Sequence, residues 1–399
     1  MAETRPIDDQ NAPATRARPA RRALMSAAVL AVVVLLFGVP LWTVFFAGSA
    51  WPRAVQLAGC VLVLIAALAL PAAMVAGHAR GDDRAARIGD SLLGIVWVSF
   101  VWSAIGAVVG LILRVVGLDD PGLSRGIAVA VVIVVVALLG WGHYEAMRVP
   151  RVVERDVALP RLGPDLDGLR VVMITDTHYG PIDRAGWSAK VVEVVNRLDA
   201  DVACHIGDLA DGSVERRRRQ VQPLEGVDAR LAKVYVTGNH EYFGEAQAWL
   251  DHMESIGWTA LHNKHITVGR GSDSLILAGV DDRTAAGSHL AGHGADLDRA
   301  LTGSDPELPI FLLAHQPKQI DDAVRHGVDL QVSGHTHGGQ IWPFEYLVRL
   351  DQPTVHGLST HGSRTQLYTS RGTGFWGPPF RVFAPSEITV LTLRSARGV

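Results

Sequence analysis

The sequence predicts a helical membrane region followed by an α/β domain, because its composition changes sharply along the chain. The first 145 residues are mostly apolar, whereas the remainder alternates short β-like runs with helix-like segments. Of the 16 histidines, all but His78 lie at or after His143. A length of 399 residues favours two or three domains. We expect a tail at 1–22, a transmembrane region at 23–143, a linker at 144–164 and the α/β domain at 165–399.

Four apolar stretches are long enough to cross a bilayer, which needs about 20 residues. They are Ala23–Gly48, Ala54–Gly77, Ser91–Leu113 and Gly126–His143. The alternative, buried helices of a large soluble domain, is not favoured because the stretches lack polar faces that would cover such a core. Tryptophans lie near the predicted span ends, where aromatic belts form, at Trp42, Trp51, Trp97 and Trp141.

The distribution of arginines predicts how the spans are oriented. Arginines gather in the N-terminal segment, the second connection and the segment after the fourth span, at Arg5, Arg16, Arg18, Arg21, Arg22, Arg80, Arg84, Arg87, Arg148, Arg151 and Arg155. The other two connections hold only Arg53, Arg114 and Arg125. The positive-inside rule then predicts a multi-pass protein of the cell membrane with its N-terminus and α/β domain in the cytoplasm. Arg21-Arg22 resembles a twin-arginine export signal, but three further spans argue against a cleaved signal.

The composition also excludes several classes of protein. A formal net charge of −3 argues against a protein that coats nucleic acid. Cys60 and Cys204 lie in a predicted span and a predicted buried strand, so we expect neither a disulfide framework nor a cysteine metal site. Asp90 lies at the mouth of the third span, and no charge pair within the spans indicates transport. The membrane region is therefore expected to be an anchor.

The second part of the chain has the pattern of two packed sheets. Within the expected linker, Val152–Leu159 has the character of a first strand. Beyond it, β-like runs alternate with helix-like segments such as Ala185–Leu198 and Gly244–Ile256. This alternation predicts two sheets that pack together with helices on the outside.

Five short motifs in this domain each follow an apolar run of strand length. The runs are Leu169–Thr175, Val202–Ile206, Val234–Thr237, Ile310–Ala314 and Leu330–Ser333. The motifs are Asp176-Thr177-His178, Gly207-Asp208, Gly238-Asn239-His240-Glu241, Ala314-His315 and Gly334-His335-Thr336-His337. Sites in α/β sheets gather where strands end, so the motifs can bring Asp, Asn and His side chains to one place. Oxygen and imidazole ligands suit a transition-metal pair better than a thiolate site.

This order of motifs resembles the calcineurin-like metallophosphoesterases, and no motif of that family's pattern is missing. The resemblance covers roughly Arg151 to the C-terminus and implies a four-layer α/β/β/α sandwich. It looks closest to a bacterial membrane-associated branch, through the segments Gly238–Tyr242, Gly334–Gln340, Ser370–Trp376 and Pro385–Ile388. The Ser/Thr protein phosphatase branch expects Arg-Gly after the second aspartate of Gly-Asp-x-x-Asp, whereas here Asp211 precedes Gly212-Ser213.

The resemblance also implies which residues bind metal. Two ions about 3.5–4 Å apart need a bridging ligand, and the match gives that role to Asp208. The remaining ligands of the first ion are Asp176, His178 and His337. Those of the second ion are Asn239, His315 and His335. Extended backbone in Asp-x-His and His-x-His would send alternate side chains the same way. We expect two divalent ions per chain, of Mn, Fe or Zn, with Mn favoured.

Other residues of the motifs are expected to act without binding metal. In the family pattern His240 faces the substrate phosphate, where it can stabilise the transition state or protonate the leaving oxygen. Glu241 is expected to hold the loop or a ligand histidine in place, and Asp211 to cap or orient. His205 is expected to pack within its strand. Six histidines match nothing and are expected at the surface: His262, His265, His289, His293, His356 and His361.

Together these features predict a membrane-anchored dimetal phosphohydrolase that cleaves a phosphodiester or phosphomonoester, with a lipid-linked phosphoester as one candidate substrate. Membrane lipids are expected partners, and specific nucleic acid is not. The alternative class is a membrane sensor or scaffold with a non-hydrolytic metal-binding domain. An inactive site, however, would have no reason to keep every ligand and His240. Alternatives among enzymes are a soluble-nucleotide or nucleic-acid phosphodiesterase, a protein phosphatase and a nucleotide-sugar-lipid pyrophosphatase.

Two stretches bear on a lipid substrate. The run Arg216–Arg219 is typical of a solvated helix face and would alternatively contact anionic headgroups. Large apolar side chains follow the last ligand motif, at Ile341, Trp342, Phe344, Tyr346 and Leu347. They are either core residues or, if exposed, a patch of the kind that marks a lipid or partner surface.

Overall fold

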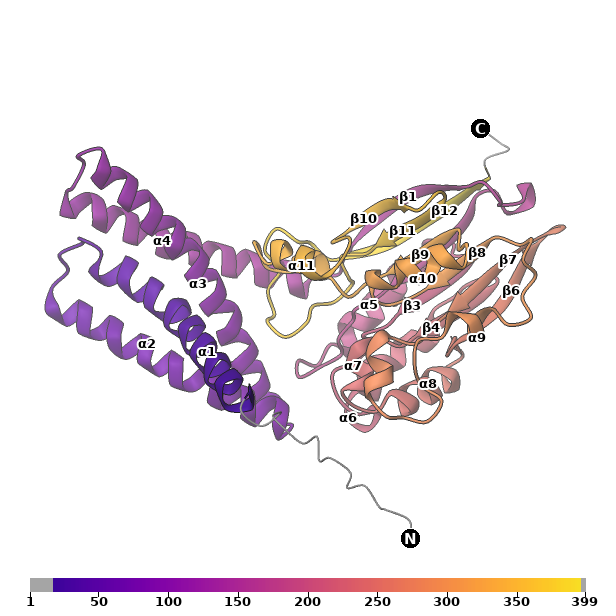
Figure 1. Ribbon diagram of the computed structural model, residues 1–399, viewed down its shortest axis with the longest axis horizontal. Coiled ribbons are helices and arrows are strands. Elements are labelled where there is room, and N and C mark those ends of the chain that lie inside the picture. Colours follow the sequence, from indigo (N-terminus) through magenta and orange to yellow (C-terminus); the bar gives the residue numbers. More distant parts are fainter. Residues whose placement is uncertain (1–16, 396–399) are drawn as a thin grey trace, which may run out of the picture. The chain divides into compact units, whose positions relative to one another are not determined.

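The computed structural model describes residues 17–395 (Figure 1). Residues 1–16 of the expected tail, with Arg5 and Arg16, lie outside the described residues. The described chain forms two compact units, each built from two stretches. One unit runs to Leu68 and resumes at Val96–Val135, and the other comprises Ala69–Ile95 and the chain from Val136 onward. The α/β domain therefore shares its unit with the second connection.

Among residues 17–395, four helices are long and apolar enough to cross a membrane, and all lie in the N-terminal part. They are α1 (Ala17–Leu41), continued by η1 (Trp42–Phe46), α2 (Arg53–Met74), continued by η2 (Val75–Ala79), α3 (Asp83–Val115) and α4 (Pro121–Met147). Large apolar side chains of α2, such as Leu57 and Leu62, are mostly exposed. Exposing so many apolar side chains to water would be costly, whereas lipid accommodates them. The four predicted apolar helices are thus confirmed.

The first sheet contains six strands in the order β1-β12-β2-β3-β4-β5. Its strands are β1 (Arg151–Leu159), β12 (Glu387–Ser395), β2 (Leu169–Ile174), β3 (Val202–Ile206), β4 (Ala232–Val236) and β5 (Thr259–Ala260). Only the β12–β2 pair is antiparallel. The expected linker therefore contributes β1, the strand expected near Val152–Leu159, to the edge of this sheet.

The second sheet also has six strands, in the order β10-β11-β9-β8-β7-β6. Its strands are β10 (Gly357–His361), β11 (Thr365–Thr369), β9 (Leu330–Ser333), β8 (Ile310–Leu313), β7 (Asp273–Gly279) and β6 (Lys264–Arg270). The pairs at the two edges are antiparallel and those in the middle are parallel.

Alternating side chains along the strands produce the layers. In β2, Val171 and Met173 pack between the two sheets, while Val172 and Ile174 pack against outer helices. The first sheet is covered by α5 (Ala185–Asn196), α6 (Val214–Val221) and α8 (Ala246–Ser255), and the second by α9 (Leu297–Leu301) and α10 (Ile320–Arg325). This arrangement is the predicted four-layer α/β/β/α sandwich. The remaining short helices are η3 (Pro164–Leu166), η4 (Gln222–Gly226), α7 (Asn239–Tyr242), η5 (Arg283–Gly287), η6 (Pro317–Gln319), η7 (His337–Gly339) and α11 (Glu345–Asp351).

The fold brings the five motif strands to a common edge. In the first sheet β2, β3 and β4 are parallel neighbours, and in the second sheet β8 and β9 are parallel neighbours. The bounds of all five strands are close to those of the predicted apolar runs. Each motif therefore lies at the carboxyl end of its strand.

Candidate dinuclear metal centre

Left-handed backbone aims most of the predicted ligands at one point. The φ angle is 54° at Asp176, 43° at His178, 50° at Asp208, 70° at His335 and 51° at His337. The prediction of extended backbone in Asp-x-His and His-x-His is therefore wrong, because the strands end before the motifs and the chain turns at each ligand. Non-glycine residues rarely adopt this conformation, and such strain clusters at functional sites.

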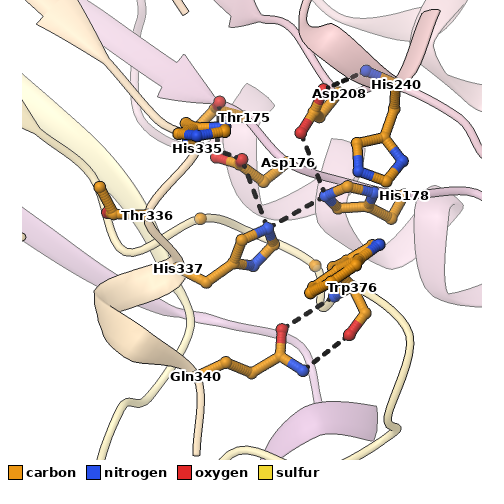
Figure 2. Close-up of polar contacts among 12 residues, drawn as sticks. Thr175, Asp176, His178, Asp208, His240, His335, Thr336, His337, Gln340 and Trp376 are labelled. Carbon is orange, nitrogen blue, oxygen red and sulfur yellow. Dashed lines mark hydrogen bonds and ion pairs between the residues drawn. The ribbon is translucent and has the colours of Figure 1, made fainter. Parts of the chain in front are cut away.

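One group of ligands comprises Asp176, His178 and His337, whose ligating atoms lie within 4.8 Å of one another. His178 Nε2 lies 3.0 Å from His337 Nε2, which in turn lies 3.5 Å from Asp176 Oδ1. Figure 2 shows these side chains pointing toward one another. All three side chains are buried. Two imidazole nitrogens that converge with a carboxylate in this way are suited to a common cation.

A second group comprises Asp208, His315 and His335, again with ligating atoms within 4.8 Å. The Ile206 carbonyl lies 2.7 Å from His315 Nδ1 and directs Nε2 of that ring toward Asp208 Oδ2, 3.1 Å away. Within the described chain, the amide oxygen of Asn239 is buried and has no hydrogen-bond partner. A buried polar atom without a partner is costly, and a cation at this point would satisfy it.

Asp208 faces both groups. Its Oδ2 lies 3.5 Å from His178 Nε2 and 3.1 Å from His315 Nε2. One carboxylate between two sets of imidazoles fits the predicted bridging role. The donors are nitrogen and oxygen atoms without a thiolate, which suits divalent Mn, Fe or Zn.

Burial and neighbouring charges shift the pKa values of the ligands. Burial raises the pKa of Asp176. Burial opposes ionisation of Asp208 too, but His315 and His240 hold its pKa well below the usual range. Burial and the neighbouring His315 lower the pKa of His335 to about 4. His335 is therefore neutral at pH 7, which is the form that binds metal.

Glu241 joins the two loops that carry Asp208 and Asn239. Its Oε1 accepts a hydrogen bond from Leu209 N–H at 2.8 Å, and its Oε2 accepts from Gly238 N–H at 2.6 Å and from Asp208 N–H at 3.1 Å. The side chain is fully buried. Of its two predicted roles, these contacts favour holding the loop.

His240 lies beside the ligands and is oriented by Asp211. Asp211 Oδ1 lies 2.7 Å from His240 Nδ1 and 3.1 Å from His178 Nδ1, which agrees with an orienting role. Burial opposes protonation of His240, but Asp208 and Asp211 raise its pKa to about 9. These carboxylates favour a protonated His240 that can donate a hydrogen bond. Its ligating atom also lies within 4.8 Å of those of His178 and Asp208, so His240 lies directly beside the ligand cluster.

Sequence analysis did not identify Arg381 as a residue of the site. It is fully buried, and its guanidinium donates to the carbonyl groups of His337, Arg371, Gly374 and Ala384. Burial lowers its pKa to about 10, so it remains charged. These bonds fix the loop around His337. Its neighbourhood is rich in Gly and Pro and has no period that would reveal a buried arginine.

Two of the histidines predicted at the surface are instead clustered. His262 and His293 have ring centroids 4.5 Å apart and flank the buried Asp281. They come from separate loops, so no sequence spacing reveals them. By contrast, His289 is exposed as predicted, and His205 is fully buried in its strand as predicted.

The arginine run Arg216–Arg219 is only partly solvated. Arg217 is buried and donates to Asp83 at 2.8 and 2.6 Å, and Arg216 donates to the same carboxylate at 2.9 Å. Asp83 begins α3, and the stretch Ala69–Ile95 belongs to the same compact unit as α6. The second connection is thus tied to the α/β domain.

A cavity of about 440 Å³ opens beside His240, within this unit. His178, Asp211 and His240 line one part of it. Trp376 is held by two hydrogen bonds with Gln340 and meets the His240 ring edge-on at 5.9 Å (Figure 2). Its other walls combine apolar, basic and acidic side chains, from Met74, Leu93, Phe243, Phe375, Arg87, Arg184, Arg216, Asp83 and Asp90. The cavity therefore offers both apolar and charged surface beside His240.

Comparisons with known proteins identify the family of this chain. Residues 169–339, which include every predicted metal ligand, match the calcineurin-like phosphoesterase family. A transmembrane protein with metallophosphoesterase domain from Danio rerio is 38% identical over 67% of this chain and 63% of its own length. This chain thus spans less than two thirds of that relative. A metallophosphoesterase of Helicobacter pylori is 38% identical over 64% of this chain and 68% of its own length. A crystal structure of a dimetal phosphatase from Danio rerio is 14% identical, with a TM-score of 0.39, over 57% of this chain and 93% of that one. The chain belongs to the calcineurin-like metallophosphoesterase family.

Proposed function

We propose that this protein is a membrane-anchored phosphohydrolase that uses two divalent metal ions to cleave a phosphoester, and that its substrate is lipid-linked. The observation that carries hydrolysis is the convergence of buried nitrogen and oxygen ligands on both sides of Asp208. A membrane sensor with a non-hydrolytic metal site is less well supported, because it would have no use for a histidine that Asp211 orients beside a cavity.

The residues of the centre have distinct roles in this proposal. Two ions, with Mn favoured, would supply an activated water and positive charge for the phosphoryl oxygens. Asp211 holds His240 in place, and His240 would donate a hydrogen bond to a phosphoryl oxygen or a proton to the leaving oxygen. Glu241 keeps the loops of Asp208 and Asn239 at a fixed separation.

An exposed apolar patch supports a lipid-linked substrate. We define the patch as Phe344, Tyr346, Leu347 and Leu350, with exposed fractions of 40%, 59%, 49% and 85%. Three of these residues lie in α11, which packs against η7 and so lies near the ligand His337. The neighbouring Trp342 contacts Phe383, which contacts Trp141 of α4. An exposed apolar patch that is close in sequence to this aromatic series is suited to the bilayer interface.

Polar substitutions in the patch should affect lipid substrates selectively. We expect Leu347→Ser/Leu350→Ser to slow hydrolysis of a phosphoester embedded in vesicles by roughly tenfold, because two apolar side chains would no longer enter the interface. Hydrolysis of a small soluble phosphodiester should be unchanged. The measurement compares the rates on both substrates for the purified full-length protein.

A matched control is Leu231→Ser/Leu290→Ser, which removes two exposed leucines outside the patch. It should leave both rates unchanged. An equal loss on vesicle and soluble substrates in the Leu347/Leu350 variant would contradict the role of the patch in lipid access.

We further propose that the α/β domain lies in the cytoplasm. Support comes from an even number of apolar helices and from arginines in the second connection and after α4, such as Arg80, Arg84, Arg148 and Arg151. A fluorescent reporter that folds only in the cytoplasm, fused after Val399, should be active. An export-dependent reporter at the same place should be inactive, and activity of the export-dependent reporter alone would overturn this orientation.

A further inference from the structure

We propose a third metal site, separate from the dinuclear centre, in which His262, Asp281 and His293 bind a zinc ion. Their ligating atoms lie within 4.8 Å of one another. The residues come from three loops, after β5, after β7 and before α9. The proposed hydrolysis uses none of them.

The separations suit a small cation. Asp281 Oδ1 lies 2.6 Å from His262 Nδ1, and Asp281 Oδ2 lies 3.8 Å from His293 Nδ1. With zinc bonds of about 2.0–2.1 Å, tetrahedral ligand atoms lie about 3.3 Å apart. The observed separations lie on both sides of this value, so small side-chain movements would close the site around an ion.

The tautomer of His293 is set by its neighbours. Gln247 Nε2 donates to Asp251 Oδ1 at 2.7 Å, which leaves Gln247 Oε1 as an acceptor 3.0 Å from His293 Nε2. His293 Nε2 therefore carries the proton, and the lone pair of Nδ1 faces Asp281. A hydrogen bond from one ring nitrogen that orients the other is typical of metal-binding histidines. The Tyr242 hydroxyl, 3.1 Å from Nδ1, is the competing partner, so a metal-free hydrogen-bonded network is the alternative that a test must exclude.

The carboxylate of Asp281 is also held from outside the cluster. Its Oδ2 accepts from Gly294 N–H at 3.0 Å and from Asn263 Nδ2 at 3.3 Å, and the residue is 1% exposed. His262 Nδ1–H donates to the other oxygen, and this proton would leave when metal binds. Two imidazoles and one carboxylate are ligands that zinc commonly takes, with water in the fourth position.

An ion at this site would brace the loops of the dinuclear centre. Tyr242, which contacts His293, belongs to α7 together with Asn239 and His240. Asp282, next to Asp281, accepts from Gln316 Nε2 at 3.0 Å, and Gln316 follows the ligand His315. The third ion would therefore stabilise the two segments that carry the ligands Asn239 and His315.

The test counts bound zinc in the full-length protein in detergent. The protein is stripped with a chelator, reloaded with Zn²⁺, freed of unbound metal and analysed by mass spectrometry of the metal. We expect His262→Ala/His293→Ala to bind one zinc ion per chain less than wild type. The matched control His265→Ala/His289→Ala, which removes two imidazoles outside the cluster, should bind as much as wild type.

A second background keeps the test decisive if the alanine variant does not fold. In Asp176→Asn/Asp208→Asn, which disables the dinuclear centre, one tightly bound zinc ion should remain, and adding His262→Ala should remove it. Equal zinc content in wild type and a folded His262→Ala/His293→Ala variant, or no tightly bound zinc in the folded Asp176→Asn/Asp208→Asn protein, would overturn the third site.

Discussion

Replacing Asp208 with asparagine is expected to remove nearly all phosphoester hydrolysis while the fold survives. The amide keeps the shape of the side chain and can still accept from His240 N–H, which lies 2.9 Å from Asp208 Oδ1. It loses the charge that both groups of imidazoles face, and no neighbouring carboxylate occupies the same position. Removing several kcal/mol of metal-dependent stabilisation of the transition state should lower kcat/KM by about 10³-fold or more.

Three measurements on the same preparation check this expectation. The rate on a chromogenic phosphodiester should fall, the metal content should fall by at least one ion per chain, and the far-UV circular dichroism should match wild type. Asp228→Asn, an exposed change of the same chemistry, should alter none of them. Wild-type turnover with full metal content in Asp208→Asn would remove Asp208 from the centre.

Replacing His240 with glutamine should leave the metal in place and lower kcat. His240 is held by Asp211 beside the cavity, whereas the predicted ligand sets are complete without it. Loss of a proton or hydrogen-bond donor to the reacting phosphate is expected to cost roughly 10²–10⁴-fold. Because this interaction strengthens in the transition state, kcat should fall at least as much as KM changes.

The metal content of this variant has to be measured together with its rate, because the His240 ring also lies close to His178 and Asp208. The variant should bind as many ions per chain as wild type. His289→Gln, at an exposed position, should behave as wild type in both respects. If His240→Gln instead lacks one ion, His240 is a ligand and the assignment of seven other ligands is wrong.

The strands of the centre could be predicted because each is an uninterrupted apolar run that ends at a polar motif. Val202–Ile206 and Leu330–Ser333 coincide with β3 and β9. Such strands are buried on both faces, so the run itself locates them without alternation. The partner of β1 could not be predicted, because Arg151–Leu159 pairs with Glu387–Ser395 at the far end of the chain. Nothing local in either segment encodes that register.

The residues that converge at the strand ends were predictable, but the backbone conformation that orients their side chains was not. The motifs contain Asp176, His335 and His337, but none of these positions is a glycine, which would have indicated a left-handed backbone. Tertiary packing imposes that conformation. The His262, Asp281 and His293 cluster escaped prediction for a related reason, since it joins three loops without a characteristic spacing. Local sequence therefore indicates which side chains are present, and the fold decides which of them meet.

The most direct test of the central claim is the metal dependence of phosphodiester hydrolysis by the purified full-length protein in detergent. Treatment with a chelator followed by its removal should abolish hydrolysis of a chromogenic phosphodiester, because the ligands around Asp208 alone cannot activate water. Adding Mn²⁺ back should restore the rate. Hydrolysis that persists in the metal-free protein, or that no divalent Mn, Fe or Zn restores, would contradict a dimetal phosphohydrolase.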